Sequence, residues 1–117
     1  MPKIKSRNIF SGLPAAKKRE AFQILQVGKE FKFERIVSRG QATPEGKWLY
    51  SKAAEWVMVL RGRAVLSFKR ERKSLVLKAG DYIFIPARTY HRVDRTSPMQ
   101  KTVWLAVHIG RVDVSKI

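Results

Sequence analysis

Few residues in this sequence are of a type that could carry catalysis or bind a metal. The 117 residues include no cysteine and only two histidines, His91 and His108. A disulfide framework, a thiolate metal cluster and a cysteine nucleophile are therefore excluded. The serines stand in no nucleophile-elbow pattern, and there is no Walker-type glycine-rich loop. The two histidines and the carboxylates are the remaining candidates, and an imidazole oriented by a carboxylate could do general acid–base work because histidine titrates near neutrality.

The charge of the chain is the second chemical signal. Lysine and arginine number 25 and aspartate and glutamate 9, which gives a formal net charge of +16. The densest basic groups are Lys17-Lys18-Arg19 and the segment 69–73. Such a field attracts nucleic acids, anionic small molecules or acidic proteins, and it also serves solubility. No helix-turn-helix, RNP-type or zinc-finger pattern accompanies it.

The composition indicates one folded domain. A hydrophobic content of 44% is too high for a disordered polycation. The longest apolar runs, 56–60 and 103–107, are far shorter than the about 20 residues that a membrane-spanning helix needs. No apolar segment follows the basic N-terminus as it would in a signal peptide. We therefore expect a cytoplasmic protein with no membrane partner.

The elements that must position the ionisable residues are short β-strands. Apolar runs punctuated by glycine and proline predict an all-β sandwich or closed barrel, and the absence of long helical patterns argues against a parallel βαβ architecture. Arg61-Gly62-Arg63 and the charged turn near Arg70 each predict a hairpin. The expected strands cover residues 30–38, 48–51, 55–61, 63–69, 73–77, 81–85, 91–96 and 102–109.

The N-terminal region is less regular. Residues 1–13 predict an irregular arm, and residues 17–27 fit either a short helix or a strand, since both periods are present. The expected organisation is one domain, with the arm, a short helix and a possible first strand in residues 1–29 and the β-barrel in residues 30–117.

The segment from Gly46 to Val107 resembles the cupin superfamily of small β-barrels. The second cupin motif runs Gly, five residues, Pro, one residue, Gly, two residues, His, three residues, Asn. In this sequence Arg88 replaces the second glycine and Arg95 replaces the asparagine. Three residues match the motif in register: Gly80, Pro86 and His91.

The first cupin motif is matched only at its end. That motif closes with Glu, six residues, Gly, and Glu55 and Gly62 have this spacing. Metal-binding cupins place a His-x-His pair just before the glutamate, where residues 48–54 read WLYSKAA. Of the usual four ligands only Glu55 and His91 remain. No cofactor is expected, and the alternative is a divalent transition metal held by these two residues.

The resemblance implies a single-domain double-stranded β-helix, or jelly-roll barrel, with a short N-terminal helix or arm, that forms a homodimer. It implies that Glu55 and His91 point into the barrel as the polar anchors of a ligand site. The aromatic residues expected to line the site are Trp48, Tyr50, Phe84 and Trp104.

The leading functional hypothesis is a barrel that binds a small organic ligand, with an anionic one favoured by the positive surface. Two alternatives stay open. One is a metal-dependent cupin enzyme, of isomerase, dioxygenase or cyclase type, with a reduced metal site. The other is a basic nucleic-acid-binding module. No catalytic residue is assigned from the sequence.

Overall fold

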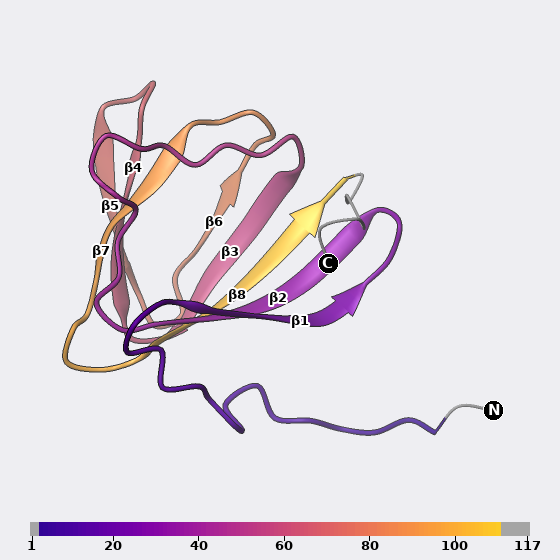
Figure 1. The fold of residues 1–117 in the computed structure, drawn as a ribbon. Coiled ribbons are helices and arrows are strands. Elements are labelled where there is room, and N and C mark those ends of the chain that lie inside the picture. Colours follow the sequence, from indigo (N-terminus) through magenta and orange to yellow (C-terminus); the bar gives the residue numbers. More distant parts are fainter. Residues whose placement is uncertain (1–2, 111–117) are drawn as a thin grey trace.

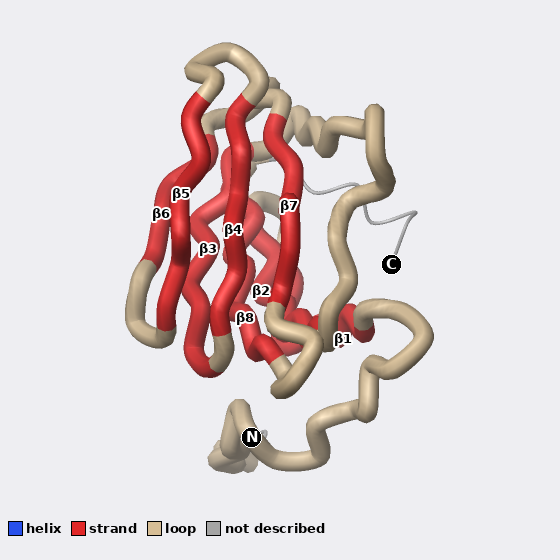
Figure 2. The backbone as a smooth tube through the Cα atoms, turned by 90° about the vertical axis from the view of Figure 1, so that its left-hand side faces the viewer, coloured by secondary structure: helices blue, strands red, loops and turns tan. Residues whose placement is uncertain are grey.

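The described residues form two antiparallel β-sheets that face each other (Figures 1 and 2). The computed structural model describes residues 3–110, so the ends of the predicted arm and barrel lie outside the described residues. One sheet has five strands in the order β1-β2-β8-β3-β6, and the other has three in the order β5-β4-β7. The strands are β1 Ala21–Val27, β2 Phe31–Ser38, β3 Ala54–Arg61, β4 Arg63–Phe68, β5 Lys73–Lys78, β6 Tyr82–Ile85, β7 His91–Thr96 and β8 Thr102–Ile109.

The predicted all-β jelly-roll class is confirmed, and the strand alternation explains the core. Successive side chains of a strand point to opposite faces, so every second residue of each strand faces the other sheet. Trp104 is 3% exposed, and its indole N–H donates to the Ser38 hydroxyl at 3.1 Å, which satisfies its polar group. The buried apolar core consists of Val57, Val59, Ala64, Leu66, Leu77, Ile85, Trp104 and Ala106.

The open question about residues 17–27 is settled in favour of the strand. Residues Ala21–Val27 form β1, which pairs with β2, and the short N-terminal helix is not formed within residues 3–110. The physical reason is that the edge of β2 offers backbone partners along most of the segment, from Val37 opposite Ala21 to Lys32 opposite Val27, with one register shift between Ile24 and Gln26. Among the described residues, no helix is long and apolar enough to span a bilayer.

Two other local predictions are wrong. Residues 48–51 do not form a strand, because only Leu49 pairs, in an isolated bridge to His91. The segment around Gly62 does not close a hairpin. The strand before it, β3, pairs with β6 and β8, whereas β4 pairs with β5 and β7. The chain therefore crosses from one sheet to the other at Gly62.

One buried side chain on the outer face of the larger sheet, that of Arg35, makes several hydrogen bonds to the arm before β1. The Arg35 guanidinium donates to the main-chain carbonyls of Ile9 at 2.8 Å, Ser11 at 2.7 Å and Gly12 at 3.3 Å. Its Nε donates to the side-chain oxygen of Gln23 at 2.8 Å. Because Arg35 is only 7% exposed, these acceptors provide the hydrogen bonds that its buried charge requires.

The corner at Gly62 generates the first prediction. Gly62 has φ of +93°, and a Cβ there would lie 2.6 Å from Thr102 Cα. Gly62→Ala combines backbone strain with this clash, and we expect a loss of about 1–3 kcal/mol or more in the free energy of unfolding, measured by urea denaturation.

The matched control is Gly80→Ala. Gly80 has the same φ of +93° but open space around its Cβ position. Gly80→Ala should lower the free energy of unfolding less than Gly62→Ala does. The difference between the two losses measures the cost of the clash with Thr102 at the start of β8. Equal losses in the two variants would show that the clash at Gly62 relaxes without cost.

Candidate functional site

A cavity of about 300 Å³ lies between the two sheets and is lined by two of the three buried ionisable residues of the described part of the chain, Glu34 and His91. Its wall is mainly apolar, which is typical of small-molecule sites. The polar exceptions are three carboxylates and two imidazoles. The apolar lining includes Phe22, Ile36, Pro44, Leu49, Val57, Leu66, Ile85, Val93 and Trp104, and the ionisable lining is Glu20, Glu34, Glu55, His91 and His108.

The strand register brings four of these groups together. Glu55 on β3 lies directly opposite His108 on β8, so both side chains project from the same face of the sheet. On the other side of β8, His108 pairs with Lys32, and Glu34 stands two residues further along β2 on that same face. The fourth group, His91, comes from the first position of β7 in the opposite sheet.

The four side chains form a continuous series that we call the Glu–His chain: Glu34, His108, Glu55 and His91. His108 Nε2 lies 3.2 Å from Glu34 Oε1 and 3.6 Å from Glu55 Oε1. The other oxygen of Glu55, Oε2, lies 3.7 Å from His91 Nε2. Carboxylate and imidazole therefore alternate along the chain, which is an arrangement able to bind hydroxyl groups or to move protons.

The orientation of His91 is set by a main-chain acceptor. His91 Nδ1 lies 2.9 Å from the Thr89 carbonyl oxygen, which can only accept a hydrogen bond. Nδ1 therefore carries a proton. When the ring is neutral, Nε2 is the unprotonated nitrogen, and its lone pair is directed toward Glu55 and the cavity.

Glu34 is the carboxyl group whose ionisation is perturbed. Burial raises the pKa of Glu34, but the hydrogen bond with His108 and the charges of Lys32 and His108 outweigh that effect, so the pKa lies below its ordinary value of 4.5. Glu34 is therefore ionised near neutral pH. His108 Nε2, the atom that faces it, must then carry a proton for the 3.2 Å contact to be a hydrogen bond.

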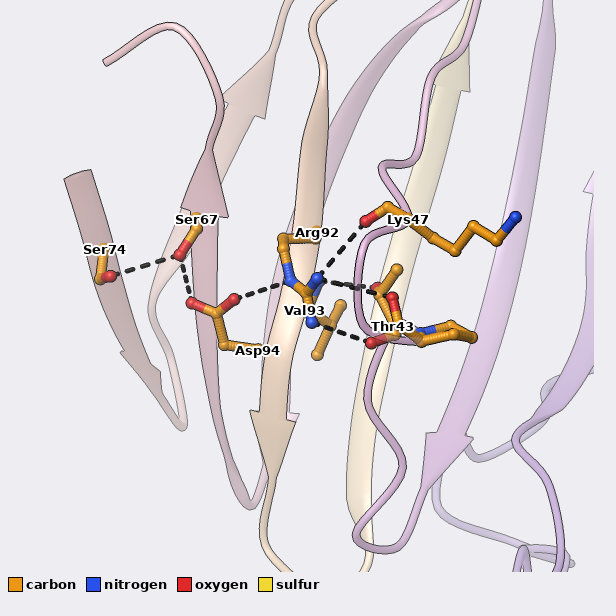
Figure 3. Close-up of polar contacts among 8 residues, drawn as sticks. Thr43, Lys47, Ser67, Ser74, Arg92, Val93 and Asp94 are labelled. Atoms are coloured by element: carbon orange, nitrogen blue, oxygen red, sulfur yellow. Dashed lines mark hydrogen bonds and ion pairs between the residues drawn. The ribbon is translucent and has the colours of Figure 1, made fainter. Parts of the chain in front are cut away.

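One wall of the cavity is a loop that is tied down by Arg92 (Figure 3). The Arg92 guanidinium donates to the carbonyls of Thr43 at 2.9 Å and Pro44 at 3.5 Å, and its Nε pairs with Asp94 at 2.9 Å. The Thr43 hydroxyl also accepts from the Val93 amide at 2.9 Å. Because Thr43 and Pro44 line the cavity, these bonds set the position of its wall.

The four aromatic residues expected at the site divide into two groups. Trp104 lines the cavity, as do Glu55 and His91. Phe84 is 57% exposed and pairs with Trp56 on the outer face of the larger sheet. Trp48 and Tyr50 flank Leu49, which is the residue of that segment that faces the cavity, so both lie outside the lining.

Sequence reasoning did not identify Glu34 and His108. Glu34 alternates with Phe31 and Phe33 along the strand, and the alternation alone does not say which face is buried. Phe31 and Phe33 are in fact 37% and 38% exposed, and Glu34 is 8% exposed. Residues of both faces are buried near the end of β2, with Val37 and Ser38 each 0% exposed, so the pattern carried no clear signal for Glu34.

Because many cupins bind a divalent metal, we ask whether the side chains of this site could hold such an ion. Two imidazoles and two carboxylates are suitable donors for a transition metal. The two histidines, however, approach different oxygens of Glu55. Within residues 3–110, no three side chains of His, Asp, Glu or Cys are arranged to hold one ion. The arrangement therefore does not fit a metal centre.

The comparison with known families identifies the class of the protein. The sequence matches the cupin domain family over residues 36–108, which is more than half of the chain. The chain therefore belongs to the cupin family. No curated protein matches the sequence.

Solved structures agree with this assignment. A protein of Ralstonia eutropha JMP134, described as a "putative mannose-6-phosphate isomerase", is 41% identical, with a TM-score of 0.87 over 92% of this chain and 99% of that one. A cupin superfamily protein of Desulfitobacterium hafniense is 14% identical, with a TM-score of 0.74 over 93% and 94%. An RmlC-like cupin of Methanocaldococcus jannaschii with a double-stranded β-helix fold is 15% identical, with a TM-score of 0.66 over 85% and 87%. The last two show the fold alone.

The lowered pKa of Glu34 generates the second prediction. Glu34 is protonated at a higher pH in the unfolded chain than in the folded one. The stabilisation by ionised Glu34 is therefore complete well above pH 4.5, and it is lost as the pH falls through the lower pKa that Glu34 has in the folded protein. We expect Glu34→Gln to lower the free energy of unfolding by about 1–3 kcal/mol near neutral pH.

Urea denaturation at several pH values measures this effect. The difference in the free energy of unfolding between the wild-type chain and Glu34→Gln should become smaller as the pH falls below 4.5. A difference that stays constant over this range would contradict the assignment of an ionised, hydrogen-bonded Glu34.

Proposed function

We propose that the cavity between the sheets binds a small organic ligand that bears several hydroxyl groups. The observation that carries this proposal is the Glu–His chain, which brings two carboxylates and two imidazoles together in a cavity whose wall is mainly apolar. Carboxylates accept hydrogen bonds from hydroxyls, and a neutral imidazole both donates and accepts. The volume of about 300 Å³ is at the lower end of the range for small-molecule sites.

The charges suggest how an anionic ligand would be oriented. Three carboxylates line the cavity, which disfavours a negative group inside it. Lys32 projects from the same sheet face as His108 and lies 4.0 Å from Glu34, with a side chain 23% exposed. A ligand with both hydroxyls and a phosphate would place its hydroxyls on the Glu–His chain and its phosphate outside, near Lys32.

Calorimetric titration with mannose and with mannose 6-phosphate tests this proposal. We expect both to bind, and Glu55→Gln and His91→Gln each to weaken binding by about 1.5–3 kcal/mol, because hydrogen bonds to charged groups have this magnitude. Phe84→Leu is the matched control, since Phe84 lies on the outer face and should leave the affinity unchanged.

Two results would contradict direct binding by these side chains. One is that Glu55→Gln and His91→Gln bind both probes as tightly as the wild-type chain. The other is a near-stoichiometric transition metal in protein purified without added metal that disappears in Glu55→Ala and His91→Ala. The second result would favour the metal-dependent enzyme.

A second candidate function is sugar isomerisation at the same site. It is supported by the 41% identical neighbour described as a "putative mannose-6-phosphate isomerase" and by the 3.7 Å separation of Glu55 Oε2 and His91 Nε2. In such a reaction the Glu55 carboxylate would take the proton from the carbon next to the carbonyl, forming an enediol, and return it to the former carbonyl carbon. His91 Nε2 would move the hydroxyl proton from one substrate oxygen to the other.

This candidate predicts that mannose 6-phosphate in D₂O is converted to the corresponding ketose phosphate, with deuterium entering at the carbon that receives the proton. NMR spectroscopy detects both events. Glu55→Gln should abolish the conversion while retaining part of the binding, because the amide keeps hydrogen-bonding groups but cannot act as the base. Binding without conversion by the wild-type chain would leave a binding protein and exclude this reaction.

A further inference from the structure

A second group of chemically active side chains lies outside the cavity, at the end of the barrel where the β4–β5 turn and the loop leading into β7 come together (Figure 2). The Lys69 amide donates to the Tyr90 carbonyl at 3.1 Å, and the Arg88 amide donates to the Ser51 carbonyl at 2.7 Å, so three segments meet there. We define the rim patch as Trp48, Tyr50, Lys69, Arg72, Arg88 and Tyr90.

The aromatic part of the rim patch is exposed rather than packed into the core. Tyr50 and Tyr90 are 46% and 48% exposed, and their ring centroids lie 4.7 Å apart with an interplanar angle of 36°. Two large rings therefore contact each other while keeping much of their surface toward solvent. Such rings offer faces on which a planar ligand can stack.

The cations of the rim patch come from the same turn and loops as these rings, and one of them, Lys69, lies beside two of the aromatic rings. Lys69 Nζ lies 5.3 Å from the centroid of the Tyr90 ring and 6.0 Å from that of Trp48. Arg72 and Arg88 are exposed. Within residues 3–110, none of these three cations has a carboxylate oxygen within 4.0 Å, although Glu71 is part of the same turn. Three cations are therefore available to an anionic ligand.

Two of these cations are kept at a conformational cost. Arg72 has φ of +49° and Arg88 has φ of +60°, in the left-handed region that favours glycine. Arg88 occupies the position at which the cupin motif has its second glycine. Of the three described non-glycine residues with a positive φ, Ala16, Arg72 and Arg88, the two arginines lie in the rim patch. A function of their side chains would account for keeping arginine where glycine would be unstrained.

We infer that the rim patch binds single-stranded nucleic acid. Unpaired bases would stack on Tyr50 and Tyr90, and phosphates would pair with Arg72, Arg88 and Lys69. Alternating stacking platforms and cations are the usual means of binding a single strand without sequence preference. A duplex keeps its bases stacked on one another and would gain nothing from the tyrosines, so the exposed rings favour the single strand. The rim patch does not include any residue that lines the cavity.

Fluorescence anisotropy with a labelled oligothymidylate of about 12 nucleotides tests the inference, since this length lies within the site sizes of single-strand binders. We expect the wild-type chain to bind it more tightly than a duplex of equal length. Oligouridylate of the same length shows whether the strand is preferred as DNA or RNA. Thymidine monophosphate should compete weakly, because it reaches only one ring and one cation.

Variants separate stacking from charge. Tyr50→Leu with Tyr90→Leu should weaken binding roughly tenfold or more, whereas Tyr50→Phe with Tyr90→Phe should preserve it. Arg72→Gly with Arg88→Gly should also weaken binding and reduce the slope of log K against log salt by about 1.4, since each phosphate contact contributes about 0.7. The glycine variants relieve the positive-φ strain, so their thermal midpoint should not fall.

The matched charge control is Lys17→Ala with Lys18→Ala, which also removes two positive charges but from the exposed segment before β1. This variant should bind as the wild-type chain does. Three results would overturn the inference: no binding at low salt, equal affinity for duplex and single strand, or equal losses in the rim and Lys17/Lys18 variants. The last result would assign the binding to net charge alone. None of these outcomes depends on whether the cavity binds a sugar.

Discussion

The Glu–His chain is the interaction on which the interior of this barrel depends. Buried carboxylates and imidazoles are destabilising unless each has a partner of the right kind. Here alternation along the strands gives every member a neighbour of opposite type, from Glu34 through His108 and Glu55 to His91. A shift of β8 by one residue against β2 and β3 would turn His108 outward and leave both glutamates without that partner. The pairing of these four side chains therefore requires the observed strand register, and it also stabilises that register over its alternatives.

Much of the fold could be predicted from the sequence, and so could two of the four residues of the Glu–His chain. Seven of the observed strands follow from short apolar runs, and the motif spacing identified Glu55 and His91. Glu34 and His108 could not be found in this way, because their proximity depends on which strands are neighbours. The sequence contains no local signal that places β2 and β3 on either side of β8. For the same reason the Gly62 corner was interpreted as a hairpin.

The distribution of charge gives the molecule two distinct environments. Three of the nine acidic residues line the cavity, and the basic residues are largely on the outside. The net positive charge is therefore a property of the surface and not of the cavity. It gives no reason to expect an anionic group inside the cavity, where the Glu–His chain favours a ligand with hydroxyl groups. The placement of Trp48 is consistent with this division, since its ring lies beside the exposed Lys69 and not in the cavity wall.

The attachment of the N-terminal arm has an evolutionary consequence. Arg35 binds the arm through the carbonyl oxygens of Ile9, Ser11 and Gly12, which every amino acid possesses. Substitutions at Ile9 and Ser11 would therefore leave these acceptors in place, provided that the arginine is retained, whereas Gly12 is restricted by its φ of +62°. We would expect arm sequences to diverge quickly among relatives while the residue equivalent to Arg35 changes slowly, so that sequence variability there would be a poor guide to structural order.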